Sequence, residues 1–168
     1  MRGLSPDDAA GLFGYRSDPA VAEFQTFRPA SIEDAIAFIR DSNPAFNQEG
    51  SWFQLGIYLK GTLIGDIGIH FLDPRNLQCE IGYTIAKRHW RRGFGKEAVA
   101  RVVTHLFADL GKHRVSASLD PANLASAALL ESLGFRKEGL FRKSILNGEE
   151  WEDDLVYAIL AEEWKPTL

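Results

Sequence analysis

The sequence has one cysteine, Cys79, and one methionine in 168 residues. A single cysteine excludes an internal disulfide framework and a cysteine-rich zinc site. The four histidines lack a metal-ligand spacing such as HExxH, so we expect no metal. No apolar run approaches the ~20 residues of a membrane span, and the first residues lack the apolar core of a signal peptide. These absences predict a cytoplasmic protein with no membrane partner.

Basic residues are fewer than acidic ones. The chain has 19 Lys and Arg and 23 Asp and Glu, which gives a formal net charge of −4. A chain that is acidic as a whole is not expected to bind nucleic acid. Hydrophobic residues make up 45% and charged residues 25%, which is ordinary for a globular protein. No repeat, low-complexity tract or Pro/Gly-rich linker divides the sequence, so we expect residues 1–168 to form a single domain.

Hydrophobic periodicity and turn residues predict the secondary structure. Ser5 and Ser31 are suitable N-caps for two early helices, and the pairs Lys60-Gly61 and Asn147-Gly148 predict hairpins. In chain order we expect helices from 5 and from 31, two strands within 52–72, a strand over 79–86, a helix over 97–110, a strand over 113–119, a helix over 123–134, and strands over 135–146 and 149–160. This order predicts a mixed α/β (α+β) fold with antiparallel hairpins at both ends.

The stretch KRHWRRGFGKEA, residues 87–98, holds five Lys or Arg residues and two glycines one residue apart. A long amphipathic run follows, so the glycines lie where a helix begins. The first turn of a helix has free N–H groups and partial positive charge, and glycines let the backbone approach an anion closely. The stretch therefore favours a phosphate site for a small anionic ligand. A solvated basic loop that caps a helix is the plainer interpretation.

Two other phosphate motifs fit this stretch less well. A P-loop requires GxxxxGK[ST], whereas here one residue separates the glycines and Glu97 follows the lysine. The dinucleotide fingerprint GxGxx[GA] is matched by Gly93, Gly95 and Ala98, and Asp120 follows about 20 residues on. In that fold, however, the first glycine directly follows a strand, and here KRHWRR intervenes after a hairpin-like segment.

Three stretches together resemble the GNAT superfamily of acetyl-CoA-dependent N-acetyltransferases, and within it the branch containing the ribosomal-protein alanine N-acetyltransferases. EIGYTIAKRHWRRGFGKEA resembles that branch's strand, link and pyrophosphate loop, NLASAALLESLGFRKEG its asparagine-containing helix, and WEDDLVYAILAEEW its closing strand. The resemblance covers nearly the whole chain and is sharpest from Cys79 to Trp164. It implies a GNAT fold, with a mixed central sheet of about six to seven strands flanked by about four helices.

The chain departs from the superfamily pattern at three places. Trp90 occupies the Gln/Arg position of [QR]xxGx[GA], where this branch often has an aromatic residue. Leu130 stands where many members carry a tyrosine that protonates the departing thiolate. Only MRGL remains of the usual first strand, so that strand is short or the start is trimmed.

The resemblance implies acetyl-CoA as cosubstrate and suggests which residues contact it. The pyrophosphate would be held by Arg91, Arg92, Gly93, Phe94, Gly95 and Lys96. Arg88 or Lys87 could meet the 3′-phosphate. The main chain near Ile85 would donate to the thioester oxygen, where such donors stabilise developing charge. Asn123 matches the family asparagine that binds the pantetheine arm, although asparagine is also a favoured N-cap.

Two residues are candidates for moving protons. Glu80 is the candidate general base, acting through water, because it begins the central strand on the face shared with Gly82, which leaves room for a substrate. The structural alternative is a strand-end carboxylate paired with an arginine. Ser126 stands where a serine has been suggested as general acid in the branch; its structural alternative is a small residue on a helix face.

The acceptor side is expected to be acidic and aromatic. Five acids occupy six positions over 149–154, in a region that lies near the acceptor cleft in the family, and would attract a cationic amine. A solvated turn is the plainer interpretation of these acids. The segments 24–39 and 43–52 should line this side, and their aromatic residues are pocket walls or core: Phe24, Phe27, Phe46 and Trp52.

We therefore expect an enzyme that transfers an acetyl group from acetyl-CoA to a primary amine, of a protein N-terminus or a small molecule, by direct attack in a ternary complex. Aminoglycoside or polyamine acetylation is the nearest alternative. A non-catalytic acetyl-CoA-binding module is a second, because the usual tyrosine is missing. The expected partners are acetyl-CoA and the amine, with a homodimer as the assembly to test.

Overall fold

The computed structural model describes residues 1–42, 45–72 and 74–165. Within these ranges the strands are β1 Arg2–Gly3, β2 Trp52–Leu59, β3 Thr62–Phe71, β4 Gln78–Ile85, β5 Arg114–Leu119, β6 Arg136–Asn147 and β7 Glu150–Leu160. The α-helices are α1 Ala9–Arg16, α2 Pro19–Ala22, α3 Ile32–Asp41, α4 Phe94–Ala108 and α5 Leu124–Ser132. Short 3₁₀ turns cover Pro6–Asp8, Lys87–His89 and Ala161–Glu163.

The strands form one mixed sheet of seven strands in the order β1-β2-β3-β4-β5-β7-β6. All neighbours are antiparallel except β4 and β5, which run parallel with α4 as their connection. This confirms the predicted mixed fold with hairpins at both ends. In the described residues five α-helices accompany the sheet, one more than the resemblance implied.

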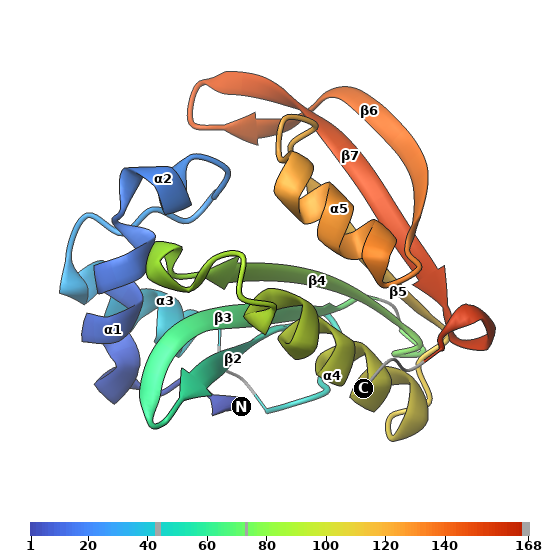
Figure 1. Ribbon diagram of the computed structural model, residues 1–168, viewed down its shortest axis with the longest axis horizontal. Helices are drawn as coiled ribbons and strands as arrows, with labels where there is room; N and C mark the ends of the chain where they lie inside the picture. Colours follow the sequence, from blue (N-terminus) through green and yellow to red (C-terminus); the bar gives the residue numbers. More distant parts are fainter. Residues whose placement is uncertain (43–44, 73, 166–168) are drawn as a thin grey trace.

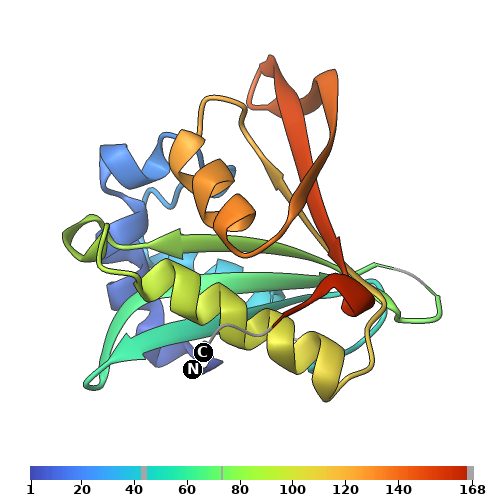
Figure 2. The same cartoon turned by 45° about the vertical axis from the view of Figure 1, so that its right-hand side comes forward.

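Helices cover both faces of the sheet (Figures 1 and 2). On one face α4 lies across β2, β3 and β4, and its Val99 and Leu106 belong to the same buried cluster as Ile81. On the other face α1 and α3 form a second buried cluster that includes Leu12 and Ile39. The alternation of β4 therefore sends its odd-numbered side chains toward α4 and its even-numbered ones toward the side of α1 and α3.

β4 and β5 pair along only part of their length. The parallel ladder joins residues 78–80 to residues 114–116, although β4 continues to Ile85 and β5 to Leu119. Beyond the ladder β5 remains paired with β7, and the two parallel strands diverge (Figure 2). We refer to residues 78–80 as the closed half of β4 and to residues 81–85 as its open half.

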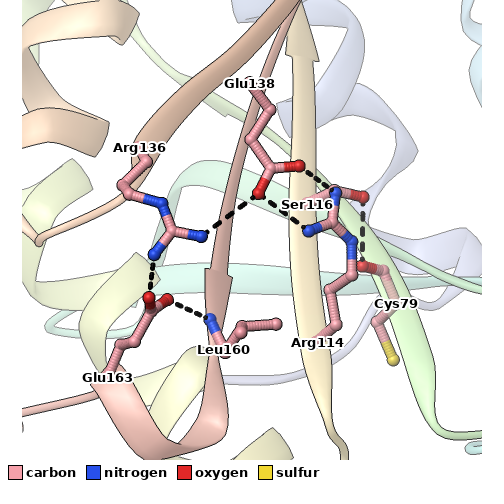
Figure 3. A network of polar contacts seen from close by, with 7 residues as sticks. All are labelled: Cys79, Arg114, Ser116, Arg136, Glu138, Leu160 and Glu163. Carbon is pink, nitrogen blue, oxygen red and sulfur yellow. Dashed lines mark hydrogen bonds and ion pairs between the residues drawn. The ribbon is translucent and has the colours of Figure 1, made fainter.

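Side-chain contacts reinforce the closed half (Figure 3). Ser116 Oγ donates to the main-chain oxygen of Cys79 at 3.4 Å. Arg114 donates to both carboxylate oxygens of Glu138, at 3.0 and 2.6 Å, and Arg136 approaches the same carboxylate at 3.5 Å. Because Arg114 lies on β5 and Glu138 on β6, these contacts cross β7 and tie the outer strands together where β5 meets β4.

Some predicted bounds differ from the observed ones for local reasons. α4 begins at Phe94, not at Glu97, because Gly93 is its N-cap with a φ of 82°, a left-handed conformation that favours glycine. β1 is short, as one of the two expectations had it. α2 was not predicted, because its four residues from Pro19 after the N-cap Asp18 are too few to show a helical period.

Candidate active site

A cleft of about 440 Å³ opens where β4 and β5 diverge. Its lining comes from α1, the segment after α2, α3, the central strands, α5 and the β6–β7 hairpin. Among the predicted site residues it brings together Glu80 from β4 with Asn123 and Ser126 from the α5 side. The predicted phosphate loop lies at the N-terminus of α4, beside the end of β4. In the described part of the chain no cluster of His, Cys, Asp or Glu is arranged to hold a metal ion.

The predicted phosphate loop, residues 91–96, includes the first-turn N–H groups of α4. The first α-helical hydrogen bond of α4 runs from the N–H of Glu97 to the oxygen of Gly93 at 3.0 Å. The N–H groups of residues 94–96 are therefore those that a helix leaves without an intrahelical acceptor. A Cβ built on Gly93 would meet nothing within 4 Å, and the cationic side chains of the loop are exposed. Open space, free N–H groups and positive charge together suit an anion.

Gly95, Phe94 and Trp90 connect this loop to the sheet. A Cβ on Gly95 would lie 3.2 Å from Leu129 and 3.5 Å from Ile85, so this glycine is needed for close packing of α4. Phe94 is half-buried and packs against the main core. The indole Nε1 of Trp90 donates to the main-chain oxygen of Ile85 at 2.6 Å, which fixes the turn between β4 and the loop.

The open half of β4 presents main-chain groups to the gap. The N–H of Ala86 donates to the oxygen of Ile64 at 2.8 Å, and such bonds alternate along an antiparallel pair. The even-numbered residues of β4 therefore bond to β3, and residues 81, 83 and 85 direct their N–H and C=O groups toward the β5 side. The oxygen of Ile85 already accepts a hydrogen bond from the Trp90 indole. Tyr83, one step deeper, lines the cleft.

α5 forms the wall opposite the open half. Asn123 is its N-cap, with Oδ1 accepting from the N–H of Ser126 at 3.1 Å; the structural alternative is thus realised, and the amide nitrogen is the group left to donate to a ligand. The Tyr83 hydroxyl donates to the main-chain oxygen of Ser126 at 3.2 Å, and burial raises its pKa to about 12. Leu130, at the tyrosine position, is fully buried.

Glu80 marks the point where β4 and β5 part. Its side chain is half-buried and lines the cleft. Burial raises the pKa of its carboxyl, and the nearby charge of Asp154 raises it further. Among the described residues it makes no ion pair. The alternative interpretation, a carboxylate paired with an arginine, is therefore wrong. A raised pKa makes this carboxylate a stronger proton acceptor than an ordinary glutamate, which suits a general base.

The β6–β7 hairpin adds negative charge to the cleft. Of the five acids at 149–154, Glu152, Asp153 and Asp154 line it. Asn147 donates to Glu152 at 3.0 Å, and Ser118 donates to Asp154. The described residues that line the cleft include five carboxylates and one cation. This balance attracts positively charged molecules.

The inner wall of the cleft was not predicted. Arg16 of α1 forms a buried ion pair with Asp66 of β3 at 2.7 Å, and Tyr15 donates to the same carboxylate. Arg16 also donates to Gln25 Oε1 at 3.2 Å, and Thr84 donates to that oxygen at 2.9 Å. Because Asp66 balances the one cation, the carboxylates set the charge of the cleft. The signal in the sequence was the lone aspartate within the apolar run TLIGDIGIHF, since a buried charge needs a partner.

The expected aromatic walls are partly present. Phe24, Phe27 and Trp52 line the cleft. Phe46 instead packs against Phe53 and Phe71, with ring centroids at 4.9 and 5.6 Å. Residues 43–44 of the predicted acceptor segment lie outside the described residues.

Known proteins share this architecture. Residues 1–136 match the family model described as an acetyltransferase (GNAT) domain. The uncharacterized N-acetyltransferase YoaA of Bacillus subtilis (strain 168) is 36% identical over 163 residues, covering 95% of this chain and 92% of its own. The [ribosomal protein uS5]-alanine N-acetyltransferase of Escherichia coli (strain K12) is 27% identical over 124 residues, covering 72% and 64%. The structure of Mycobacterium smegmatis RimJ in complex with CoA-disulfide has a TM-score of 0.85 at 26% identity, covering 96% of this chain and 81% of that one.

Proposed function

The chain belongs to the GNAT acetyltransferases, and from that premise we propose that it transfers the acetyl group of acetyl-CoA to a primary amine by direct attack in a ternary complex. The observation that carries the proposal is the divergence of β4 and β5 beside the N-terminus of α4. It joins an anion site to a carboxylate-lined cleft by a path bordered with main-chain hydrogen-bonding groups. An acyl carrier with a phosphate at one end and a thioester at the other fits that path.

The residues present fit the cosubstrate. Residues 91–96 would hold its pyrophosphate through the first-turn N–H groups of α4. Lys87 and Arg88 are exposed next to the loop and would meet the 3′-phosphate. The open half of β4 would hold the pantetheine arm through the main-chain N–H and C=O groups that it leaves unpaired among the described residues. From the opposite wall the amide N–H of Asn123 would donate a hydrogen bond to the arm. When bound, the cosubstrate supplies an acetyl thioester at the cleft.

The donor to the thioester oxygen is the main-chain N–H of Tyr83. Ile85 was the position expected from the sequence, and its N–H faces the same gap. Tyr83 is one pair of residues deeper and lines the cleft, so its N–H is the one nearer the carboxylates. A donor held in place in this way lowers the activation barrier by about 3 kcal/mol.

Glu80 and Ser126 manage the protons. The attacking amine must be neutral, although its pKa is about 8 for an N-terminus and about 10.4 for a lysine-like amine. Glu80 accepts that proton through water, and its raised pKa brings the carboxyl closer to the amine. Ser126 lies on the opposite wall, where its hydroxyl would take the remaining proton of the acylated nitrogen as it gives its own to the departing thiolate, so that amide and thiol form and the serine is unchanged. Leu130 has no group for this task.

Two acceptor classes are supported by different observations. The Escherichia coli relative is named for an alanine N-terminus of a ribosomal protein, which supports a protein N-terminal amine. The carboxylates of the cleft support a small polycationic amine such as a polyamine or aminoglycoside. Both classes present a protonated primary amine that Glu80 would have to deprotonate.

The test is a thiol-release assay with acetyl-CoA against N-terminal peptides, polyamines and aminoglycosides. We expect thiol release with at least one class, and mass spectrometry should show one added acetyl group on the amine. Gly93→Asp serves as the control that abolishes release. Acetyl-CoA binding without acetylation of any amine would contradict the proposal and indicate a binding module.

A further inference from the structure

Gln54 is a cleft residue that the proposed reaction does not use. It lies on β2, is 5% exposed and lines the cleft. Its buried Oε1 has no hydrogen-bond partner in the described part of the chain. Buried polar atoms in proteins are nearly always paired. An unpaired acceptor in the wall of a binding cleft therefore points to a donor supplied by the ligand.

A pair of glycines makes room for this amide. A Cβ on Gly68 of β3 would lie 2.7 Å from Nε2 and 3.2 Å from Oε1 of Gln54, so the amide rests over the bare backbone of Gly68. Gly68 pairs with Gly82 of β4, where a Cβ would meet nothing within 4 Å. The amide thus lies one strand spacing, ~5 Å, from the open space over Gly82, next to Glu80.

The other glutamine of the cleft shows the contrast. Gln25 Oε1 accepts from Arg16 at 3.2 Å and from Thr84 at 2.9 Å, so its oxygen is satisfied by the protein. Gln54 Oε1 has no such donors among the described residues. The two side chains line one cleft but differ in whether the fold supplies their partners.

We propose that Gln54 recognises the acceptor by accepting a hydrogen bond from a second N–H group of the acceptor molecule, a few carbons from the reacting amine. This inference rests on the proposed function and adds the substrate class. The reacting nitrogen lies over Gly82 near Glu80, and the rest of the acceptor extends across β3 toward Gln54. Diamines and peptide N-termini both carry such a second donor.

The test uses two probes with the same charge. 5-Aminopentanamide has a second N–H donor, whereas its N,N-dimethyl amide does not. With CoA present, calorimetry on the wild type should show at least about tenfold tighter binding of the first probe. Gln54→Met keeps the size of the side chain and should remove that preference. Equal affinities in the wild type, or an unchanged preference in Gln54→Met, would overturn the proposal.

Stability measurements separate recognition from a structural role. Gln54→Met loses no internal hydrogen bond of its amide oxygen, so its melting temperature and its acetyl-CoA affinity should stay at the wild-type values. Gln25→Met loses two hydrogen bonds and should melt lower. A lower melting temperature for Gln54→Met with unchanged probe binding would identify Gln54 as structural. The comparison of the two probes on the wild type does not depend on the folding of any variant.

The outcome for the reaction itself is independent. If probe binding depends on Gln54 but no thiol is released, the Gln54 subsite is supported and the proposed reaction is rejected. If both probes are acetylated equally, the reaction is supported and the Gln54 subsite is rejected. 1,5-Diaminopentane and alanyl-alaninamide then distinguish a small diamine from a peptide terminus. The compound that loses more affinity in Gln54→Met identifies the class, and no loss with either overturns the proposal.

Discussion

The two halves of β4 have the same backbone alternation but different partners. In the closed half, residues 78–80 pair with β3 on one edge and β5 on the other. In the open half, residues 81–85 keep the β3 edge, and the other edge faces the cleft. The first arrangement builds the sheet, and the second leaves main-chain donors and acceptors for a ligand. Glu80, the last residue of the ladder, belongs to both.

The comparison indicates that the site is created by stopping a ladder and not by adding a special element. The closed half carries the side-chain network of β5 and β6 (Figure 3). Next to the open half lie the glycine loop, the indole hydrogen bond of Trp90 and the carboxylates of the cleft. Substitutions in the open half should therefore change ligand binding and turnover, and those in the closed half should change stability.

The largest effect is expected from Gly93→Asp, at the N-cap of α4 beyond the open half. The carboxylate would lie at the first turn of α4 and repel a phosphate, so acetyl-CoA affinity should fall by about 100-fold or more. Gly93→Asn is the control, because it has the same size, tolerates positive φ and carries no charge. No atom lies within 4 Å of the added Cβ, but the φ of 82° strains any side chain at this position. Aspartate and asparagine adopt positive φ more readily than other residues, so both variants should fold with the same loss of stability. Equal affinities of the two variants in calorimetry would place the phosphate elsewhere.

Glu80→Gln, at the boundary of the halves, should lower kcat by about 100-fold. The loss should be largest between the raised pKa of Glu80 and the amine pKa of about 8, where the amine still holds a proton and the carboxylate can accept it. Asp154→Asn is the companion variant: removing that charge lowers the pKa of Glu80, so the acid limb of kcat/KM should move to lower pH. A pH–rate profile unaltered by Glu80→Gln would remove Glu80 as the base.

The same residue predicts a gain in stability. Because burial raises the pKa of Glu80 in the folded state, folding favours the protonated carboxyl. Its favourable contribution is present at low pH and is lost as the pH rises through the raised value. Glu80→Gln should therefore melt above the wild type at pH 8 and show little difference near pH 4. A lower melting temperature at pH 8 would contradict the assigned burial effect.

A smaller effect is expected from Trp90→Phe. The variant keeps an aromatic ring and loses the hydrogen bond to the oxygen of Ile85, so acetyl-CoA affinity should fall about fivefold. Trp164→Phe is the matched control, since its indole donates to Thr104 at 3.1 Å, away from the loop. An equal change in both variants would show that the indole acts through general stability.

The smallest effect is expected from Glu138→Gln, in the side-chain network beside the closed half. Its ion pairs lie at the surface, so the free energy of unfolding should fall by less than about 1 kcal/mol, and less at high salt. Hydrogen bonding to Arg114 holds the pKa of Glu138 below its usual value. The stabilisation from these ion pairs is therefore fully present at a pH above the usual pKa of a glutamate, and it is lost as the pH falls through the lowered pKa. kcat/KM should not change; a marked loss would show that the closed half takes part in catalysis.

The elements could be predicted because their signals are local. Alternation identified β4 and its two faces, and Gly61 and Gly148 have the positive φ values of 82° and 64° that their turns need. The divergence of β4 and β5 could not be predicted, because the alternation of apolar and polar residues is the same in both halves. Where a ladder stops depends on β7 and α5, which are distant in the sequence.

The site was predicted where residue type implies a task. Glu80, Asn123 and Ser126 do meet at the cleft, and residues 91–96 do form a helix N-terminus; their roles remain predictions. Arg16, with its partner Asp66, and Gln54 were missed as site residues. A lone polar residue in an apolar segment shows that a partner is needed but not which one.

The edge of residues 81–85 that has no strand partner among the described residues has a consequence for the protein's resistance to proteolysis. A pantetheine arm that bonds to it would act as an additional strand, so the coenzyme would add to the sheet itself as well as occupy a pocket. Coenzyme binding would then complete backbone hydrogen bonds that folding leaves open. The resistance of the protein to proteolysis should accordingly rise and fall with the supply of acetyl-CoA in its surroundings.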